Sequence, residues 1–212
     1  VRVVEAATGT RLPRIAHGGP VSRAAFSPDG QLVATASDDK TARLVDVTTG
    51  RELARIEHGG PVSSVAFSPD GRLVATASAD RTARVVEVAT GKELARIEHG
   101  APVASVTFSP DGRSVATASD DKVARVVEVA TGKLLWRSSP LVSNGESFII
   151  KGDGIICGYG FTDEQDYLYV LDRHTGKTVS KTLVKSGPER LALIGDILHV
   201  RTYNTDYQFR VN

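Results

Sequence analysis

The chain has 212 residues, enough for one sizeable domain or two small ones. Its hydrophobic fraction of 41% and charged fraction of 24% exclude a disordered or a collagen-like chain. The net charge of +1 gives no reason to expect a nucleic-acid partner, and no apolar run reaches the roughly 18–20 residues that span a bilayer. The single cysteine, Cys157, excludes an intrachain disulfide framework. The first residues do not form an apolar segment of signal-peptide type. Methionine is absent altogether, so we expect the chain to start inside a longer product or an engineered one.

A 41-residue internal repeat dominates the sequence. Blocks 17–57, 58–98 and 99–139 follow one another without a gap; the first two agree at 32 of 41 positions and the last two at 30 of 41. Residues 1–16 match the second half of this unit, so the repeat is entered part-way through. A period of this length indicates a solenoid or a propeller.

Each unit divides into four short segments with strand patterning. In the middle copy the predicted strands are Val62–Phe67, Leu73–Ser78, Thr82–Val88 and Glu93–Ile97, separated by turn residues such as Ser68-Pro69-Asp70-Gly71. Proline or glycine interrupts the pattern about every ten residues, which disfavours helix. Four strands in roughly 40 residues are typical of a β-propeller blade. A solenoid is the alternative, and the half-unit at the N-terminus favours closure of a ring.

The repeated pattern of a histidine, V-x-x-V-x-F-S-P-D-G and A-S-x-D-x-T resembles the WD40 repeat over residues 1 to about 139. The resemblance implies a hydrogen-bonded set in each blade: a histidine, a strand serine or threonine, a turn aspartate and a tryptophan. Here valine replaces the tryptophan, at Val45, Val86 and Val127, so each set is expected to be a structural triad. The matching triads are His17, Ser37 and Asp39; His58, Ser78 and Asp80; and His99, Ser119 and Asp121.

A different composition follows residue 140. All five tyrosines lie beyond it, and a fainter repeat relates ESFIIKGD at 146–153 to ERLALIGD at 189–196. The run LYVLDRHTGKTV at 168–179 resembles a blade of pyrroloquinoline-quinone-type (PQQ-like) propellers. The sequence therefore resembles WD40-like blades joined to PQQ-like blades, and we interpret it as an engineered or chimeric propeller.

We predict a single all-β domain, a β-propeller of about five four-stranded blades. The predicted parts are a closing half-blade at 1–16, WD40-like blades at 17–57, 58–98 and 99–139, a PQQ-like blade at 140–187 and a partial one at 188–212. We expect 21 strands, one more than five blades need. The last blade is predicted to take its inner strands from 188–203 and its outer strand from 11–16, so that VRVVEA and YQFRVN compete for the third place. A homo-oligomer that shares strands is the alternative.

Several side chains that could carry chemistry have structural interpretations. The three repeat histidines cannot converge on one metal ion, because equivalent positions of successive blades are rotated apart. The acidic pairs Asp38-Asp39 and Asp120-Asp121 lie in predicted turns, where aspartate caps its own backbone. Gly152-Asp153-Gly154 and Gly158-Tyr159-Gly160 lack the helix of a phosphate-binding loop. Cys157 is expected to be a small buried residue.

The predicted function is that of a non-catalytic scaffold. The chain is expected to bind a protein or peptide partner on a propeller face, or to be an engineered hybrid without a native ligand. We expect it to hold no cofactor and no metal. The alternative is a fragment of a quinoprotein-like, cofactor-binding enzyme, whose stacking aromatics are represented here by a single tryptophan, Trp136. WD40-like blades imply the cytoplasm and PQQ-like blades a bacterial envelope. The compartment stays open, with the cytoplasm slightly favoured.

Overall fold

The computed structural model describes residues 1–5, 7–138, 148–159, 166–185, 188–194, 196–202 and 205–210. These residues form strands and turns without a helix, so none of them lies in a helix that could cross a membrane. The repeat units give β1 (Val21–Phe26), β2 (Leu32–Ser37), β3 (Thr41–Asp46), β4 (Glu52–Glu57), β5 (Val62–Phe67), β6 (Leu73–Ser78), β7 (Thr82–Glu87), β8 (Glu93–Glu98), β9 (Val103–Phe108), β10 (Ser114–Ser119), β11 (Ala124–Glu128) and β12 (Leu134–Arg137). The remainder gives β13 (Phe148–Lys151), β14 (Gly154–Tyr159), β15 (Asp166–Asp172), β16 (Thr178–Val184), β17 (Pro188–Ile194), β18 (Ile197–Thr202) and β19 (Asp206–Arg210).

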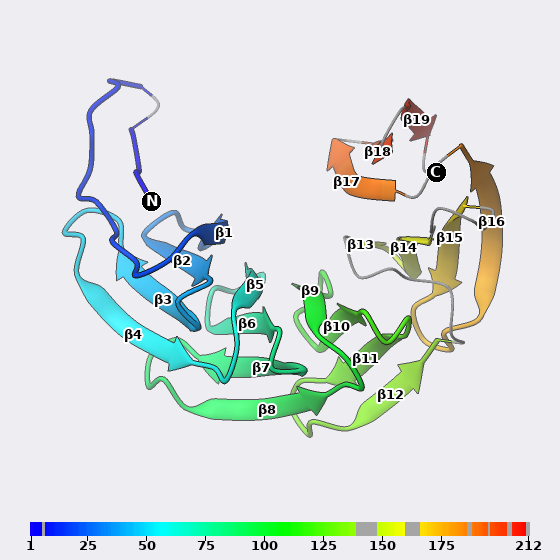
Figure 1. Ribbon diagram of the computed structural model, residues 1–212, viewed down its shortest axis with the longest axis horizontal. Coiled ribbons are helices and arrows are strands. Elements are labelled where there is room, and N and C mark those ends of the chain that lie inside the picture. The colour runs from blue at the N-terminus through cyan, green and yellow to red at the C-terminus, as the bar shows by residue number, and fades with distance from the viewer. Residues whose placement is uncertain are drawn as a thin grey trace.

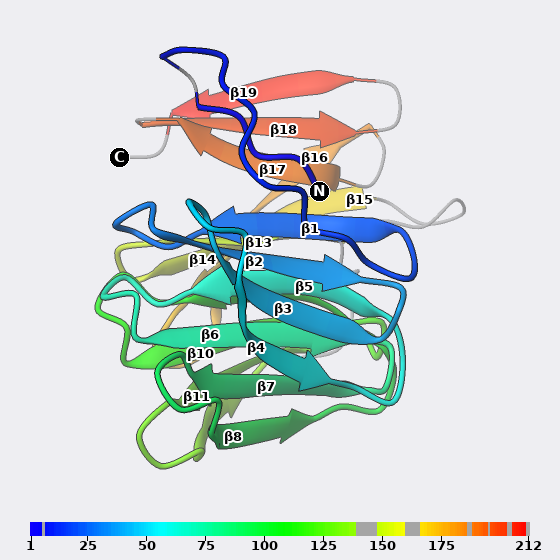
Figure 2. The same cartoon turned by 90° about the vertical axis from the view of Figure 1, so that its left-hand side faces the viewer.

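The strands form five antiparallel sheets, which we number as blades. Blades 1 to 4 are the four-stranded sheets β1–β4, β5–β8, β9–β12 and β13–β16, and blade 5 is the three-stranded sheet β17–β19. Figure 1 shows the blades side by side around an arc, with the first strand of each on its inner side. Figure 2 shows blade 1 from outside, its four strands in sequence order. The predicted all-β propeller fold is confirmed, as are the four strands of the middle unit, of which the third ends at Glu87 and the fourth at Glu98.

The turn after the first strand of each unit is fixed by local hydrogen bonds. Gly71 adopts a φ of 73°, open to glycine without strain, and its N–H donates to the Ser68 carbonyl at 2.9 Å. The Ser68 hydroxyl donates to Asp70 Oδ1 at 2.6 Å and accepts from the Leu73 N–H at 2.9 Å. The run S-P-D-G therefore fixes the register of β5 against β6 through contacts within the turn itself.

The hydrophobic core lies between the blades. The face that a blade turns to the next one is called its forward face, and the opposite one its backward face. The forward face of blade 1 carries small residues on β2, Ala34 and Ala36, with Leu44 beside them. They pack against Val62 and Val74 on the backward face of blade 2, which are fully buried. Alanines in the second strand let neighbouring sheets approach closely, which explains why L-V-A-T-A-S recurs in two units.

The chain ends do not meet as the sequence predicts. The two halves of the N-terminal segment are hydrogen-bonded to each other. The Leu12 N–H donates to the Val3 carbonyl at 3.0 Å, and the Ile15 N–H donates to the Val1 carbonyl at 3.1 Å. Val3 and Ile15 then pack on the backward face of blade 1. Within the described residues, blade 5 contains no strand from the N-terminus, because β19 takes the third place beside β18. The predicted closure by residues 11–16 is therefore replaced by an open arc, with the termini on opposite sides of the opening (Figure 1).

Candidate functional site

The structure brings the predicted histidine and aspartate together in the first two units. His58 Nδ1 lies 3.0 Å from Asp80 Oδ2, and His17 Nδ1 lies 2.9 Å from Asp39 Oδ2. In blade 3 the corresponding distance, from His99 Nδ1 to the carboxylate of Asp121, is 3.6 Å. Each histidine thus bonds within its own blade, and no group of three or more His, Cys, Asp and Glu side chains in the described part of the chain is placed to hold a metal ion.

The hydroxyl group of each set comes from a threonine, and the prediction of Ser37, Ser78 and Ser119 for this place is wrong. His Nε2 lies 2.7 Å from Thr35 Oγ1 in blade 1 and 2.9 Å from the equivalent threonine oxygen in blades 2 and 3. Side chains alternate along a strand, so serine two residues later shares the face but lies one step nearer the turn. These partners are Thr35, Thr76 and Thr117.

The serines instead hold the turn that positions the aspartate. The Ser78 hydroxyl donates to the Gly60 carbonyl at 3.0 Å and accepts from the Asp80 N–H at 3.1 Å. Ser37 and Ser119 make the same pair of contacts with their own turns, donating to the carbonyls of Gly19 and Ala101 and accepting from the aspartate N–H groups. The serine therefore acts on the histidine only through the turn that carries the aspartate.

An arginine that the sequence analysis missed completes each set. Arg84 Nη2 lies 3.2 Å from Asp80 Oδ2, while its Nη1 donates to the Glu57 carbonyl at 2.8 Å. Arg43 makes the equivalent contacts, with Asp39 at 3.0 Å and with the Ala16 carbonyl at 2.8 Å. The signal was present, because an arginine recurs every 41 residues, four positions after the turn aspartate, in all three units.

Blade 3 departs from this arrangement because valine replaces a threonine. In blade 2, Thr82 binds Asp80 Oδ1 through both its N–H and its hydroxyl, whereas Val123 offers Asp121 only its N–H. There, the guanidinium of Arg125 contacts His99 Nδ1. Because arginine can only donate, Nδ1 must accept and Nε2–H must donate to the threonine, the opposite tautomer to that of blades 1 and 2.

These contacts shift the ionisation of the buried groups. Burial acts to raise the pKa of Asp80, but the hydrogen bonds from Thr82, Gly59 and His58 outweigh it and hold this pKa well below 3.8. Burial lowers the pKa of His58, and burial together with the Arg125 charge lowers the pKa of His99 to about 4. The histidines of blades 2 and 3 are thus neutral at pH 7, hydrogen-bonded and 8% exposed. Their geometry supports the blade and leaves neither ring nitrogen open to a substrate.

The remaining predicted residues lie in structural positions. Cys157 is fully buried between blades 3 and 4, and burial raises the pKa of its thiol to about 12, so it is a small core residue as predicted. Trp136 lies on the outer strand β12, 7% exposed, and its indole N–H donates to the Arg173 carbonyl. Gly152 is in the β13–β14 turn and Gly154 and Gly158 are in β14, while Gly160 lies outside the described residues.

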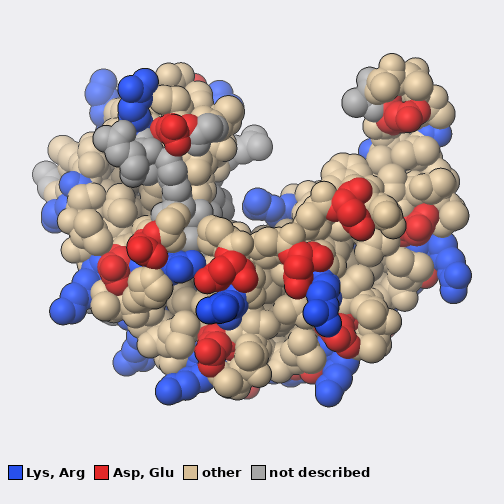
Figure 3. Space-filling view, turned by 180° about the vertical axis from the view of Figure 1, so that it is seen from behind, with Lys and Arg blue, Asp and Glu red and all other residues tan. Residues whose placement is uncertain are grey.

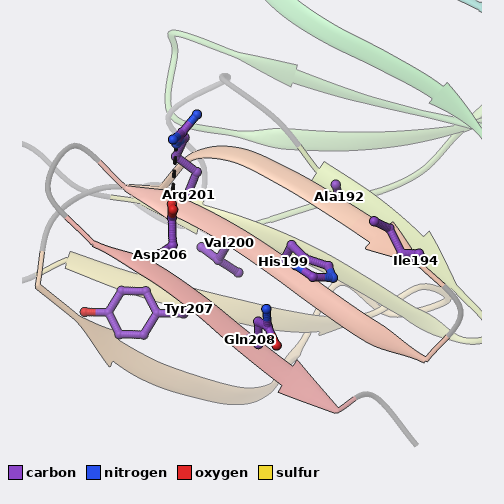
Figure 4. A pocket seen from close by; sticks show the side chains of 8 residues that line it. All are labelled: Ala192, Ile194, His199, Val200, Arg201, Asp206, Tyr207 and Gln208. Atoms are coloured by element: carbon purple, nitrogen blue, oxygen red, sulfur yellow. Dashed lines mark ion pairs between the residues drawn. The ribbon is translucent and has the colours of Figure 1, made fainter.

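An open pocket of about 630 Å³ lies on the forward face of blade 5, at the end of the arc. Figure 4 shows side chains from all three strands around it, with Arg201 and Asp206 paired at 3.4 Å. The pocket is lined by Ala192, Ile194, His199, Val200, Arg201, Asp206, Tyr207 and Gln208. None of the residues predicted from the sequence as triad members lies on this face.

The polar side chains of this pocket occupy places that are apolar in blades 1 to 3. The irregular register of β17 against β18, at Pro188/Arg190, matches that of β1 against β2, at Val21/Arg23, and places His199 opposite Ala192 as Ala34 is opposite Ala25. By the same register Arg201 takes the place of Ala36, and Gln208 that of Leu44. Those three residues of blade 1 are at most 1% exposed.

Comparison with known proteins identifies the family. Residues 1–206 match the family model described as outer membrane protein assembly factor BamB, which covers both of the regions that we distinguished in the sequence. No curated protein matches the chain. The crystal structure of the computationally designed Ika8 protein is similar, with a TM-score of 0.82 at 20% identity, and this similarity shows the fold alone. The match covers 99% of this chain and 64% of that one, so the chain spans less than two thirds of that protein. With more than nine tenths of its residues matched, the chain belongs to the family described as outer membrane protein assembly factor BamB.

Proposed function

We propose that the chain is a non-catalytic propeller scaffold that binds a protein partner on the forward face of blade 5. The observation that carries the proposal is the replacement of the buried Ala34, Ala36 and Leu44 of blade 1 by His199, Arg201 and Gln208. If this face packed against the apolar face of another blade, Arg201 would lose its hydration without gaining a polar partner. The face is therefore suited to contact with a polar surface.

The chemistry of the face is that of a protein interface. Imidazole, guanidinium and amide groups supply donors and acceptors, and Ile194, 67% exposed, places an apolar side chain beside them. Arginine and apolar side chains set among polar groups are common in protein interfaces. Figure 3 shows acidic and basic side chains interspersed along the visible face of the arc, which gives no continuous basic track for a nucleic acid.

Site-specific crosslinking tests this proposal. A photoreactive amino acid at position 199 is expected to give a discrete adduct with a protein from an extract, and the purified partner should bind the unmodified chain. Arg201→Glu should abolish both the adduct and the binding. The matched control is position 179 on β16, where Val179 is also 67% exposed. The same adduct from both positions, or an adduct that survives Arg201→Glu, would overturn the proposal.

A quinone-binding enzyme is the second candidate, favoured by the run LYVLDRHTGKTV. The residues present do not fit this cofactor. Trp136 packs between blades and its indole N–H donates to the Arg173 carbonyl, so its ring is not available for stacking on a quinone. Titration with pyrroloquinoline quinone and calcium is expected to give no bound-cofactor absorbance. Saturable binding would favour the enzyme.

We also propose that residues 1–139 are WD40-like blades joined to PQQ-like blades at about 140–212, in an engineered or chimeric chain. The near-identity of the three units and the end of their 41-residue pattern after residue 139 support this division.

A further inference from the structure

The outer strand of each four-stranded blade lies on the rim of the arc, and within the described residues only one of its edges is paired (Figure 1). In β16 the regular pairing with β15 beyond a β-bulge runs over five residues, 180–184. The corresponding run has four residues in β4 and β8 and two in β12. Blade 4 is flanked by blades 3 and 5, so this long open edge is a property of a complete blade and not of a chain end.

The bulge and the composition of β16 define where another strand could pair. Val179 is the extra residue of the bulge, between Thr178 and Ser180, which pair with successive residues of β15. A bulge disrupts the ladder locally, so an added strand would pair with the residues that follow it. These residues, S-K-T-L-V, include no proline or glycine, and threonine and valine favour the extended conformation.

The charge of this edge is uniformly positive. Between Asp172 and Glu189 the sequence has no acidic residue, whereas Lys177, Lys181 and Lys185 recur at intervals of four. The three lysines are exposed and form no ion pair with any residue that the structure describes. The outer strands of blades 1 and 2 carry mixed charges instead, two glutamates and an arginine each, with the arginine bonded to one of the glutamates. The positive charge of β16 is thus left without a counter-charge.

A lysine and a leucine of β16 lie on one face of the strand. Lys181 is opposite Tyr169 and Leu183 is opposite Tyr167, so all four side chains are on the backward face of blade 4. The Lys181 ammonium lies 4.4 Å from the centre of the Tyr167 ring, a cation–π contact that fixes its position. Leu183 is 58% exposed. An added strand would therefore meet a positive charge and an apolar side chain two residues apart.

We propose that residues 180–184 bind an extended acidic segment of a partner protein, which adds to blade 4 as a fifth strand. Main-chain hydrogen bonds to the open edge provide affinity. Carboxylates beside Lys181 and Lys185, with an apolar residue beside Leu183, provide specificity. A second copy of this edge is a poor partner, because pairing two β16 strands would bring their lysines together. The lysines thus select an acidic strand over a like one.

The probe is a fluorescein-labelled peptide, T-E-T-V-T-E-T, whose glutamates and valine would lie beside Lys181, Lys185 and Leu183 in an antiparallel added strand. Fluorescence anisotropy with the full chain should show saturable binding. Lys181→Glu should weaken it roughly tenfold or more, as expected for the loss of a charge-assisted contact. Lys92→Glu, the same change at an exposed position just before β8, is the matched control and should bind normally. Arg201→Glu should also bind normally, which separates this site from the forward face of blade 5.

A charge exchange tests the pairing directly. The lysine form of the peptide, T-K-T-V-T-K-T, should not bind the wild type but should bind the double variant Lys181→Glu/Lys185→Glu. Both positions are exposed, so this variant should keep the melting temperature of the wild type.

N-methylation of the peptide tests whether its backbone pairs with β16. In an added strand, alternate amides bond the neighbouring strand and the others face solvent. Of two peptides, one N-methylated at the glutamates and valine and one at the threonines, one should therefore lose binding and the other keep it. Hydrogen exchange should show added protection within residues 180–184 and none in β8.

The proposal is overturned if the peptide does not bind, if Lys92→Glu weakens binding as much as Lys181→Glu, or if the two N-methylated peptides bind alike. An oligothymidylate that binds at least as tightly, with the same dependence on Lys181, would assign the edge to a nucleic acid and reject the acidic peptide. Protection of residues 180–184 that rises with the concentration of the chain alone would assign the edge to a second copy and would equally reject the proposed partner.

Discussion

At the residue scale, each repeat unit places a histidine where both ring nitrogens have a partner. In blade 2 these partners are Asp80 and Thr76, and Arg84 closes the set from the third strand. Val86, on the third strand of the same blade, is 2% exposed and packs between blades without joining these hydrogen bonds. A buried polar group that loses its partner costs about 1–3 kcal/mol, so each member of the set is expected to contribute to stability.

Thr76→Val separates the role of the threonine from that of the serine. The substitution keeps the shape of the side chain but leaves His58 Nε2 buried without a partner, so the free energy of unfolding should fall by about 1–3 kcal/mol. Denaturant unfolding measures the loss. His58 should also change its ring ¹⁵N shifts in NMR, whereas Ser78→Ala should leave those shifts nearly unchanged, because Ser78 contacts only the turn. Equal shifts in both variants would contradict the assigned partners.

Stability should fall as the pH falls from 7 to 4. The folded pKa of His99 is lowered to about 4 from 6.5, so between these values the unfolded chain binds more protons than the folded one. One pKa unit corresponds to about 1.4 kcal/mol, so His99 should account for a loss on the order of 2–3 kcal/mol at pH 4, and His58 acts in the same direction. Below pH 3.8 the lowered pKa of Asp80 adds a further loss, because the carboxyl of the unfolded chain then takes up a proton while that of the folded chain stays ionised. Urea unfolding at pH 7, 5.5 and 4 measures the free energy of unfolding. In His99→Gln this free energy should change less steeply with pH above pH 4.

At the element scale, turn glycines share a φ near 70° but differ in their surroundings. Gly91, between β7 and β8, has no heavy atom within 4 Å of an added Cβ, whereas at Gly176, between β15 and β16, a Cβ would overlap the indole of Trp136. The first position is required by backbone conformation alone, and the second also by packing between blades 3 and 4.

Alanine at these two glycines should therefore cost different amounts. Gly91→Ala should lower the free energy of unfolding by about 1–2 kcal/mol, the cost of the left-handed conformation for an L-residue. Gly176→Ala should cost a further 1–3 kcal/mol, roughly, because the Trp136 ring must move. Thermal unfolding of the pair measures the difference. Equal midpoints would show that the indole is not held against this turn.

At the scale of the whole molecule, the arc is stabilised by contacts between neighbouring blades, as in repeat proteins. The N-terminal half-blade covers Val33 and Val45 on the backward face of blade 1, the place that a preceding blade would take. It therefore shields the backward face of blade 1 from solvent, while the forward face of blade 5 carries polar side chains.

Deletion of residues 1–16 should expose Val33 and Val45. We expect a lower melting temperature and concentration-dependent association, which scanning calorimetry and sedimentation velocity measure. The milder Ile15→Ala should cost about 2–4 kcal/mol, as for other buried isoleucines, whereas Leu94→Ala, at a position 42% exposed, should cost much less. A truncated chain that stays monomeric with an unchanged melting temperature would show that the half-blade does not cap blade 1.

Local sequence patterns are sufficient to predict the blades. The 41-residue period, the S-P-D-G turns and the alternation within strands predict β5 to β8 nearly to the residue, whereas the pairing of histidine with turn aspartate was implied by the resemblance to the WD40 repeat. They could not tell Thr76 from Ser78, because both lie on one face of β6 and only the position of the neighbouring loop decides which hydroxyl meets the imidazole. Nor could they place the chain ends. Two segments fit the third place of blade 5, and the tertiary structure gave it to β19, because residues 1–16 bury Val3 and Ile15 against blade 1 instead.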